Sequence, residues 1–184
     1  MTRATLTAFV DCLFLIIFIL VLLPHNPEVS QAETAVPPGS VVVQVEWQPG
    51  INVDVDLWVQ APGDAPVGYS NKGAKFFNLL RDDLGNQSDT TPLNVEYAYS
   101  RGQPAGEYTV NLHLYRVLSG PDAIPCRVRI SVRGDSKIAR VIFERDVVLA
   151  HQGQELTVQR FTLDEHGEVV AESRIPKALR SARQ

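Results

Sequence analysis

The sequence VDVDLWVQ at residues 53–60 alternates apolar and polar side chains over the length of one β-strand. Successive side chains of a strand point to opposite faces, so one face of this segment carries only branched apolar residues. That face consists of Val53, Val55, Leu57 and Val59, and the other face consists of Asp54, Asp56 and Trp58. A strand with one apolar face must pack it against another layer, which predicts a β-sheet with a hydrophobic core behind it.

Similar runs rich in Val, Leu, Ile and Tyr recur from residue 41 onward, separated by Gly, Pro, Asn and Asp. The predicted strands are residues 41–47, 53–60, 93–99, 106–118, 126–133, 138–149, 154–163 and 169–174. In the fourth run, Tyr108, Val110, Leu112 and Leu114 oppose Thr109, Asn111 and His113. The pattern predicts an all-β fold, an antiparallel β-sandwich of about eight strands, in preference to a closed barrel. The run AKFFNLL at residues 74–80 is helix-like, and we expect a short turn or insertion beside the sheet there.

The charged residues and cysteines of the chain limit which partners and which stabilising bonds are expected. The chain has 184 residues, with 17 basic and 21 acidic side chains and a formal charge of −4. No cluster of Lys or Arg indicates a nucleic-acid surface, so nucleic acid is not an expected partner. The two cysteines, Cys12 and Cys126, cannot pair within one chain if Cys12 lies in a membrane. We therefore expect one globular domain held by its core and not by disulfides.

The N-terminal segment, residues 1–24, reads as a short cytoplasmic start and one transmembrane helix. Residues 5–24 supply about the 20 residues that a helix needs to cross a bilayer, and Pro24 ends the run. Arg3 and the N-terminal amine are the positive charges near the start, and no basic residue follows until Lys72. The positive-inside bias then places the N-terminus in the cytoplasm and the rest of the chain on the other side of the membrane.

A cleaved signal peptide is the competing interpretation. Residues 12–23 would be its apolar region, and Ser30, Gln31 and Ala32 would form a small-x-small cleavage site that leaves a mature N-terminus near Glu33. An apolar region of this kind normally follows basic residues, whereas here the acid Asp11 stands directly before it. The flanking residues favour the anchor, and the signal peptide stays open.

Asp11 is the one acid in the apolar run. A carboxyl group at the centre of a membrane helix costs about 2.5 to 3.5 kcal/mol on insertion scales, which makes it a functional-site hypothesis. Thr7 lies one turn earlier on the same helix face and can hydrogen-bond the carboxyl group, or it can simply cap the helix start. Only Thr5 and Thr7 add polar groups nearby, so we expect a proton and not sodium as the transported ion.

The string LTAFVDCLFLIIFILVL at residues 6–22 resembles the single transmembrane helix of the ExbD/TolR family, with the MotB-type stator subunits more distantly similar. The resemblance rests on the step from Thr7 through Phe9 and Val10 to Asp11, followed by a Leu/Ile/Phe-rich run. It implies a homodimer of such helices inside a ring of polytopic ExbB/TolQ/MotA-like subunits, with Asp11 taking up and releasing the transported proton. The small α/β exterior domain that is usual in that family is not visible in this sequence.

The remaining segments divide by composition. Residues 25–40 contain three prolines and no aromatic residue, and they read as an extended linker. Residues 41–175 form the predicted exterior β-sandwich. Residues 176–184 form a basic and weakly apolar tail, which we expect to be frayed.

Two acidic pairs are the candidate metal ligands. Asp54 and Asp56 lie on one strand face, and Asp82 and Asp83 follow a later apolar run. Carboxylate oxygens that converge at one end of a sheet would suit Ca²⁺, the one candidate cofactor. A solvated strand face followed by a turn with local backbone bonds is the simpler explanation.

Residues 54–63, 81–85 and 104–115 together resemble a group of bacterial exported β-sandwich domains with the pattern D-x-D-L-x-V-x-x-P, an acidic loop and P-x-G-x-Y-x-V. That resemblance implies a binding or scaffold role. The sequence has no GxSxG, HExxH, phosphate-binding loop or dinucleotide-binding turn, so we expect no enzyme. Trp47, Trp58 and the tyrosines would form a sugar-binding platform only if they are not part of the core.

Two functions follow from these patterns. The first is a bitopic inner-membrane subunit of a proton-driven motor or energy-transducing complex, in which Asp11 carries the proton and the β-sandwich engages a periplasmic protein or envelope partner. The second is a secreted or anchored β-sandwich that binds Ca²⁺ or glycan after removal of a signal peptide.

Overall fold

The computed structural model describes residues 14–15, 39–84, 93–134 and 138–180. The chain divides into two units, Met1–Ala35 and Val36–Gln184, and all strands lie in the second. Phe14 and Leu15 are helical. Thr7, Asp11, most of the predicted transmembrane helix and most of the linker lie outside the described residues. No helix within the described ranges is long and apolar enough to cross a membrane.

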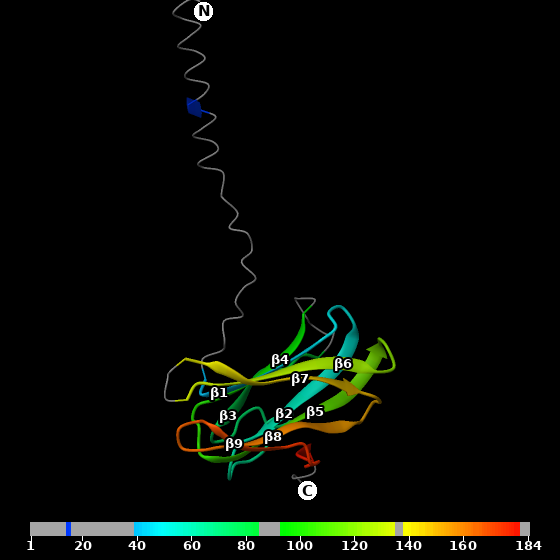
Figure 1. Cartoon of the computed structure of the whole chain (residues 1–184). Helices are drawn as coiled ribbons and strands as arrows, with labels where there is room; N and C mark the ends of the chain where they lie inside the picture. Colours follow the sequence, from blue (N-terminus) through cyan, green and yellow to red (C-terminus); the bar gives the residue numbers. More distant parts are fainter. Residues whose placement is uncertain (1–13, 16–38, 85–92, 135–137, 181–184) are drawn as a thin grey trace, which may run out of the picture. The chain divides into compact units, whose positions relative to one another are not determined.

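The second unit consists of two antiparallel sheets packed face to face (Figure 1). The strands are β1 (Val41–Trp47), β2 (Asn52–Gln60), β3 (Phe77–Arg81), β4 (Asn94–Ser100), β5 (Gly106–Ser119), β6 (Ile124–Val132), β7 (Arg140–Leu149), β8 (Glu155–Leu163) and β9 (Val169–Ser173). One sheet has the order β3-β4-β1-β6-β7, and the other has the order β2-β5-β8-β9. The all-β sandwich is confirmed, and each of the eight predicted strands begins and ends within two residues of an observed one.

The prediction of a turn or insertion at residues 74–80 was wrong, because part of this run forms the edge strand β3. Phe77 and Leu79 are both buried, and they lie opposite Ser100 and Ala98 of β4. The two-residue spacing of these large side chains lets them enter the core together from a strand, which outweighs the helix-like composition of the run.

The core lies between the two sheets. The apolar face predicted for residues 53–59 and that predicted for residues 108–114 both point into it and are buried. Tyr108 stacks on Phe161 of β8 with ring centroids 5.2 Å apart, and its hydroxyl group donates to the carbonyl oxygen of Pro104 at 2.8 Å. An aromatic ring with a bonded hydroxyl group can be buried without leaving a polar atom unpaired.

The opposite faces of β2 and β5 are also buried, which alternation alone does not predict. Among the residues buried there are Asp54, Asp56, Trp58, Thr109, Asn111 and His113. Part of the cover is the segment after β9, because the amide of Asn111 and the hydroxyl group of Thr157 donate to the carbonyl oxygen of Lys177. Leu179 is buried as well. The expectation of a frayed tail was therefore wrong for residues 176–180.

A segment between β2 and β3 closes one side of the sandwich. Val67 pairs with Val59 of β2, and Gly73 pairs with Asn78 of β3, so both edge strands on this side have a backbone neighbour. Gly68 lies against the indole of Trp58, where an added Cβ would come within 2.4 Å of the ring. Only glycine permits this close approach of backbone to ring.

Candidate functional site

The aspartates proposed as metal ligands lie near a further carboxylate, Glu96, at the closed side of the sandwich. Glu96 lies on β4 opposite Val45 and points into the interior, with no part of it exposed. Its Oε2 accepts a hydrogen bond from the backbone N–H of Leu57 at 2.7 Å, and its Oε1 accepts one from the N–H of Asp83 at 3.0 Å. β2 is the edge of its sheet, so the carboxylate binds an N–H that no strand neighbour pairs at that position. Glu96 thereby ties the two sheets to the loop after β3.

Asp83 is buried beside Glu96 and holds the same loop. Its Oδ2 accepts hydrogen bonds from the backbone N–H of Val95 at 3.2 Å and from the guanidinium group of Arg81 at 3.2 Å. Asp82 instead forms an ion pair with Lys72 at 2.8 Å. The two neighbouring aspartates therefore have different roles, one inside the sandwich and one with a surface lysine.

Asp56 forms a buried pair with His113, which lies directly opposite it on β5. The Oδ2 of Asp56 lies 2.7 Å from the Nδ1 of His113, and the residues are 3% and 2% exposed. Asp54 lies opposite Arg116 in the same strand pair, and its Oδ2 is 3.7 Å from the guanidinium nitrogen. Each aspartate of the D-x-D motif thus faces a basic side chain on the neighbouring strand. Cross-strand pairing explains this, because residues opposite each other share one face of the sheet.

Burial shifts the ionisation of three of these carboxyl groups. It raises the pKa of Asp54 to about 6, the negative charge of Asp56 adds to this, and Arg116 opposes it. It also raises the pKa of Asp56, against the hydrogen bond and charge of His113, and raises that of Glu96 well above its usual range. Desolvation disfavours the charged form of a carboxyl group, and here it exceeds the opposing contacts.

The stability of the sandwich should therefore depend on pH through Asp54. Its folded-state pKa is above its unfolded value, so its contribution is fully present below about pH 4 and is lost as the pH rises through about 6. The difference between the ordinary pKa of 3.8 and the pKa of about 6 in the folded protein corresponds to roughly 3 kcal/mol for Asp54. Chemical unfolding of the wild type and of Asp54→Asn from pH 4 to 8 should show a difference that grows with pH, with the variant gaining relative stability. A constant difference over this range would contradict the assignment.

The structure brings the predicted metal ligands near one another without forming a complete ion site. In the described part of the chain, no group of three His, Cys, Asp or Glu side chains is placed to hold a metal ion. Most of the carboxylates are bonded to protein N–H groups or basic side chains, as described above. The Oδ1 atoms of Asp54 and Asp82 are buried and have no hydrogen-bond partner among the residues that the structure describes. Calcium binding through these two oxygen atoms stays a prediction.

The two tryptophans do not form an open platform. Trp47 is buried in the core, and its Nε1 donates to the carbonyl oxygen of Val53 at 3.2 Å. Trp58 is buried under Gly68 and packs edge to face against Tyr69 at 5.6 Å. Tyr69 and Tyr115 stay exposed, with ring centroids 6.0 Å apart. A sugar that stacks on the indole faces would have to displace backbone, so only the tyrosines remain for such contacts.

The sequence patterns predict Asp54, Asp56, Asp82 and Asp83 as members of one cluster, but they do not predict that Glu96 and His113 belong to it. His113 had a usable signal, because it stands on the strand whose alternation matches that of the D-x-D segment. Glu96 had no comparable signal, since its partners are 39 and 13 residues away along the chain. Comparisons with protein-family models, with curated proteins and with solved structures find no match for this chain.

Proposed function

We propose that the chain is a single-pass inner-membrane subunit of a proton-driven motor or energy-transducing complex. Asp11 would carry the proton, and the β-sandwich would engage a periplasmic partner. The observation that carries the proposal is the position of Asp11, a lone acid in an apolar run long enough to span a bilayer. A carboxyl group in an apolar seam is neutral when it is shut off from water and ionised when a hydrated path opens. That change can couple proton passage to movement of the helix.

The proposal requires further subunits. A single helix cannot shield Asp11 on all sides from lipid, and intramembrane acids normally face a bundle interior or a water-filled path. The resemblance at residues 6–22 supports a homodimer of this chain inside a polytopic ExbB/TolQ/MotA-like subunit. Thr7 would face the same seam and hydrogen-bond the Asp11 carboxyl group.

The sandwich supports a binding or scaffold role in this proposal. The carboxylates of Asp83 and Glu96 accept hydrogen bonds from backbone N–H groups of their own fold. Groups used in this way hold loops and sheet edges in place. A domain stiffened at the side where Glu96 and Asp83 lie is suited to transmitting force or holding a partner outside the membrane.

An exported binding module is the second candidate, favoured by the Oδ1 atoms of Asp54 and Asp82, which are unpaired within the described part of the chain. It would lose residues 1–32 on export, and its ligand would be Ca²⁺ or a glycan. The two candidates differ in the mature N-terminus. We expect the mass of the chain purified from membranes to include residues 1–32, with or without Met1. A mature chain that begins near Glu33 would exclude the motor proposal, because it would lack Asp11.

A further inference from the structure

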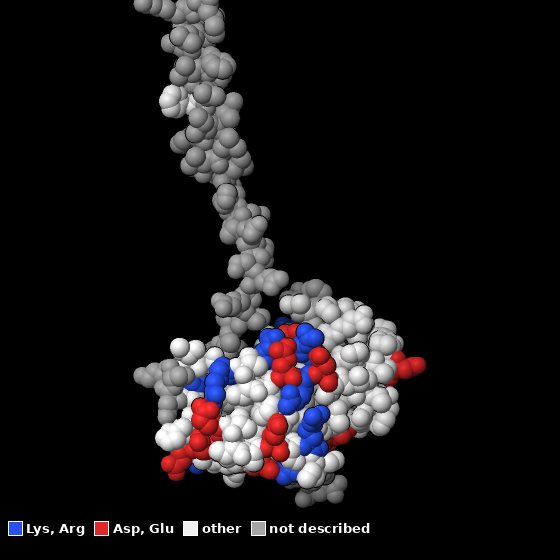
Figure 2. Space-filling view, viewed as in Figure 1, with Lys and Arg blue, Asp and Glu red and all other residues white. Residues whose placement is uncertain are grey.

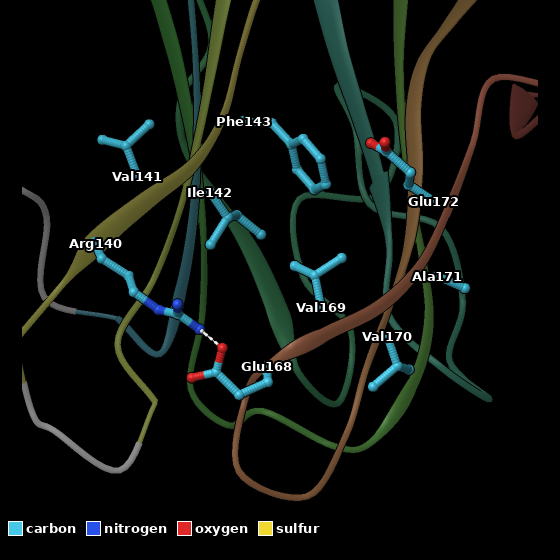
Figure 3. A pocket seen from close by; sticks show the side chains of 9 residues that line it. All are labelled: Arg140, Val141, Ile142, Phe143, Glu168, Val169, Val170, Ala171 and Glu172. Carbon is cyan, nitrogen blue, oxygen red and sulfur yellow. Dashed lines mark ion pairs between the residues drawn. The ribbon is translucent and has the colours of Figure 1, made fainter.

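The side of the sandwich opposite the covered edge is open. There, β7 is the last strand of one sheet and β9 the last strand of the other, and each pairs with only one strand among the described residues. A groove of about 500 Å³ lies between them, lined by residues 140–143 of β7 and residues 168–172. Figure 3 shows Val169 pointing from β9 toward Ile142 and Phe143, whereas Val170 points away from the groove.

Strands β7 and β9 expose several apolar side chains, which is unusual for strands at the edge of a sheet. Val141 and Val148 on β7 are each more than half exposed, and Val170 on β9 is 62% exposed. Proteins normally shield such edges with a covering segment or with short strands, because unpaired N–H and C=O groups attract another strand. The opposite side of this sandwich has such a cover at residues 67–74, whereas β7 is ten residues long and has none among the residues described.

The charges that line the groove neutralise one another. Arg140 forms an ion pair with Glu168 at 2.5 Å, drawn as a dashed line in Figure 3. Arg145 lies 3.5 Å from Glu172. Figure 2 likewise shows acidic and basic side chains interspersed on the face that it presents, with no broad patch of one sign. A partner for the groove therefore needs no net charge, and a buried charge without its own counter-ion would be penalised.

A second copy of this chain is a poor occupant. Glu144 and Asp146 both lie on the outer face of β7, where they pair with Arg129 and Arg127 of β6. Antiparallel pairing of two β7 strands with their outer faces on the same side of the sheet, in the two registers closest to full overlap, would place Glu144 opposite Asp146 or opposite itself. Like charges directly opposite on neighbouring strands are destabilising.

We propose that the β7–β9 groove binds an extended, uncharged segment of a partner protein, which adds as a strand to the free edge of β7. Its apolar side chains, at alternate positions, would cover Ile142, Phe143 and Val169, and its backbone would pair with β7. This inference deepens the proposed partner-binding role of the sandwich and rests on it, but it does not depend on Asp11.

The test uses the full chain in detergent and an uncharged nine-residue peptide that alternates valine and threonine. The control is the same peptide with a central proline, which removes one N–H and interrupts strand pairing. We expect the first peptide to slow hydrogen exchange of the β7 amides, and the proline peptide to bind roughly tenfold more weakly or worse. Protection away from β7, or equal binding of both peptides, would overturn the proposal. So would β7 protection that depends on protein concentration without peptide, because that would indicate a second copy.

Matched variants on β9 locate the contact. Val169→Asp should weaken binding of the alternating peptide by roughly tenfold, since it puts an unpaired charge in the groove. Val170→Asp makes the same change at the next residue, whose side chain points away from Ile142 and Phe143, and should leave binding unchanged. Equal effects of the two substitutions would contradict the assigned groove. Asp11→Asn should leave peptide binding intact, so failure of this proposal and failure of the proton-carrying role can be told apart.

Discussion

Glu96→Ala is expected to lower the free energy of unfolding by about 3 to 5 kcal/mol. The substitution removes the acceptor for the N–H groups of Leu57 and Asp83, and both bonds are buried. Each buried N–H left without a partner costs roughly 1 to 3 kcal/mol, and the lost side-chain volume adds a cavity term. Burial also makes the charged form of Glu96 unfavourable, as its raised pKa shows. Removing this buried charge offsets part of the loss of stability.

Chemical unfolding of the full chain in detergent measures this effect. Glu96→Gln keeps one carbonyl acceptor of nearly the same shape, so we expect an intermediate loss of about 1 to 3 kcal/mol. Glu46→Ala is the matched control, because Glu46 is exposed on the neighbouring strand β1, and its change should stay within about 0.5 kcal/mol. Equal losses for Glu96→Ala and Glu46→Ala would show that the Glu96 carboxylate does not hold the sheets together.

Most strand positions could be predicted because every strand except β9 has at least one face that enters a common core. Residues 53–59 and 108–114 show this most clearly, and their predicted apolar faces are both buried. The β3 segment was missed because only two of its residues, Phe77 and Leu79, enter the core. A strand that short gives too few repeats to separate a period of two from a helical period.

The acidic cluster could be predicted only in part. Alternation places Asp54 and Asp56 together, but it does not reveal what covers the second face of their strand. The cover comes from residues far along the chain, such as Lys177, which bonds Asn111 across 66 residues. Alternation is misleading for β4, because Val95 and Tyr97 are more apolar than Glu96, yet Glu96 faces the interior. The backbone N–H of Leu57 on the edge strand β2 needs an acceptor, and Glu96 supplies it by pointing into the interior. That need is not visible in the local sequence of β4.

Asp11→Asn is expected to abolish proton-driven function while the protein still enters the membrane and assembles. Asparagine has nearly the same shape and can hydrogen-bond, but it cannot take up or release a proton at physiological pH. Asp11→Glu keeps a carboxyl group one methylene farther from the backbone, so we expect it to retain part of the activity. Thr7→Ala tests the supporting contact, and we expect a smaller loss than that of Asp11→Asn.

The most direct test measures proton entry with a pH-sensitive dye in cells that express the chain together with its polytopic subunit. Membrane fractionation of each variant and its co-purification with that subunit serve as controls for insertion and assembly. We expect proton entry in the wild type, partial entry in Asp11→Glu, and only background entry in Asp11→Asn at equal protein levels. Wild-type proton entry in an inserted and assembled Asp11→Asn variant would contradict the claim that Asp11 carries the proton.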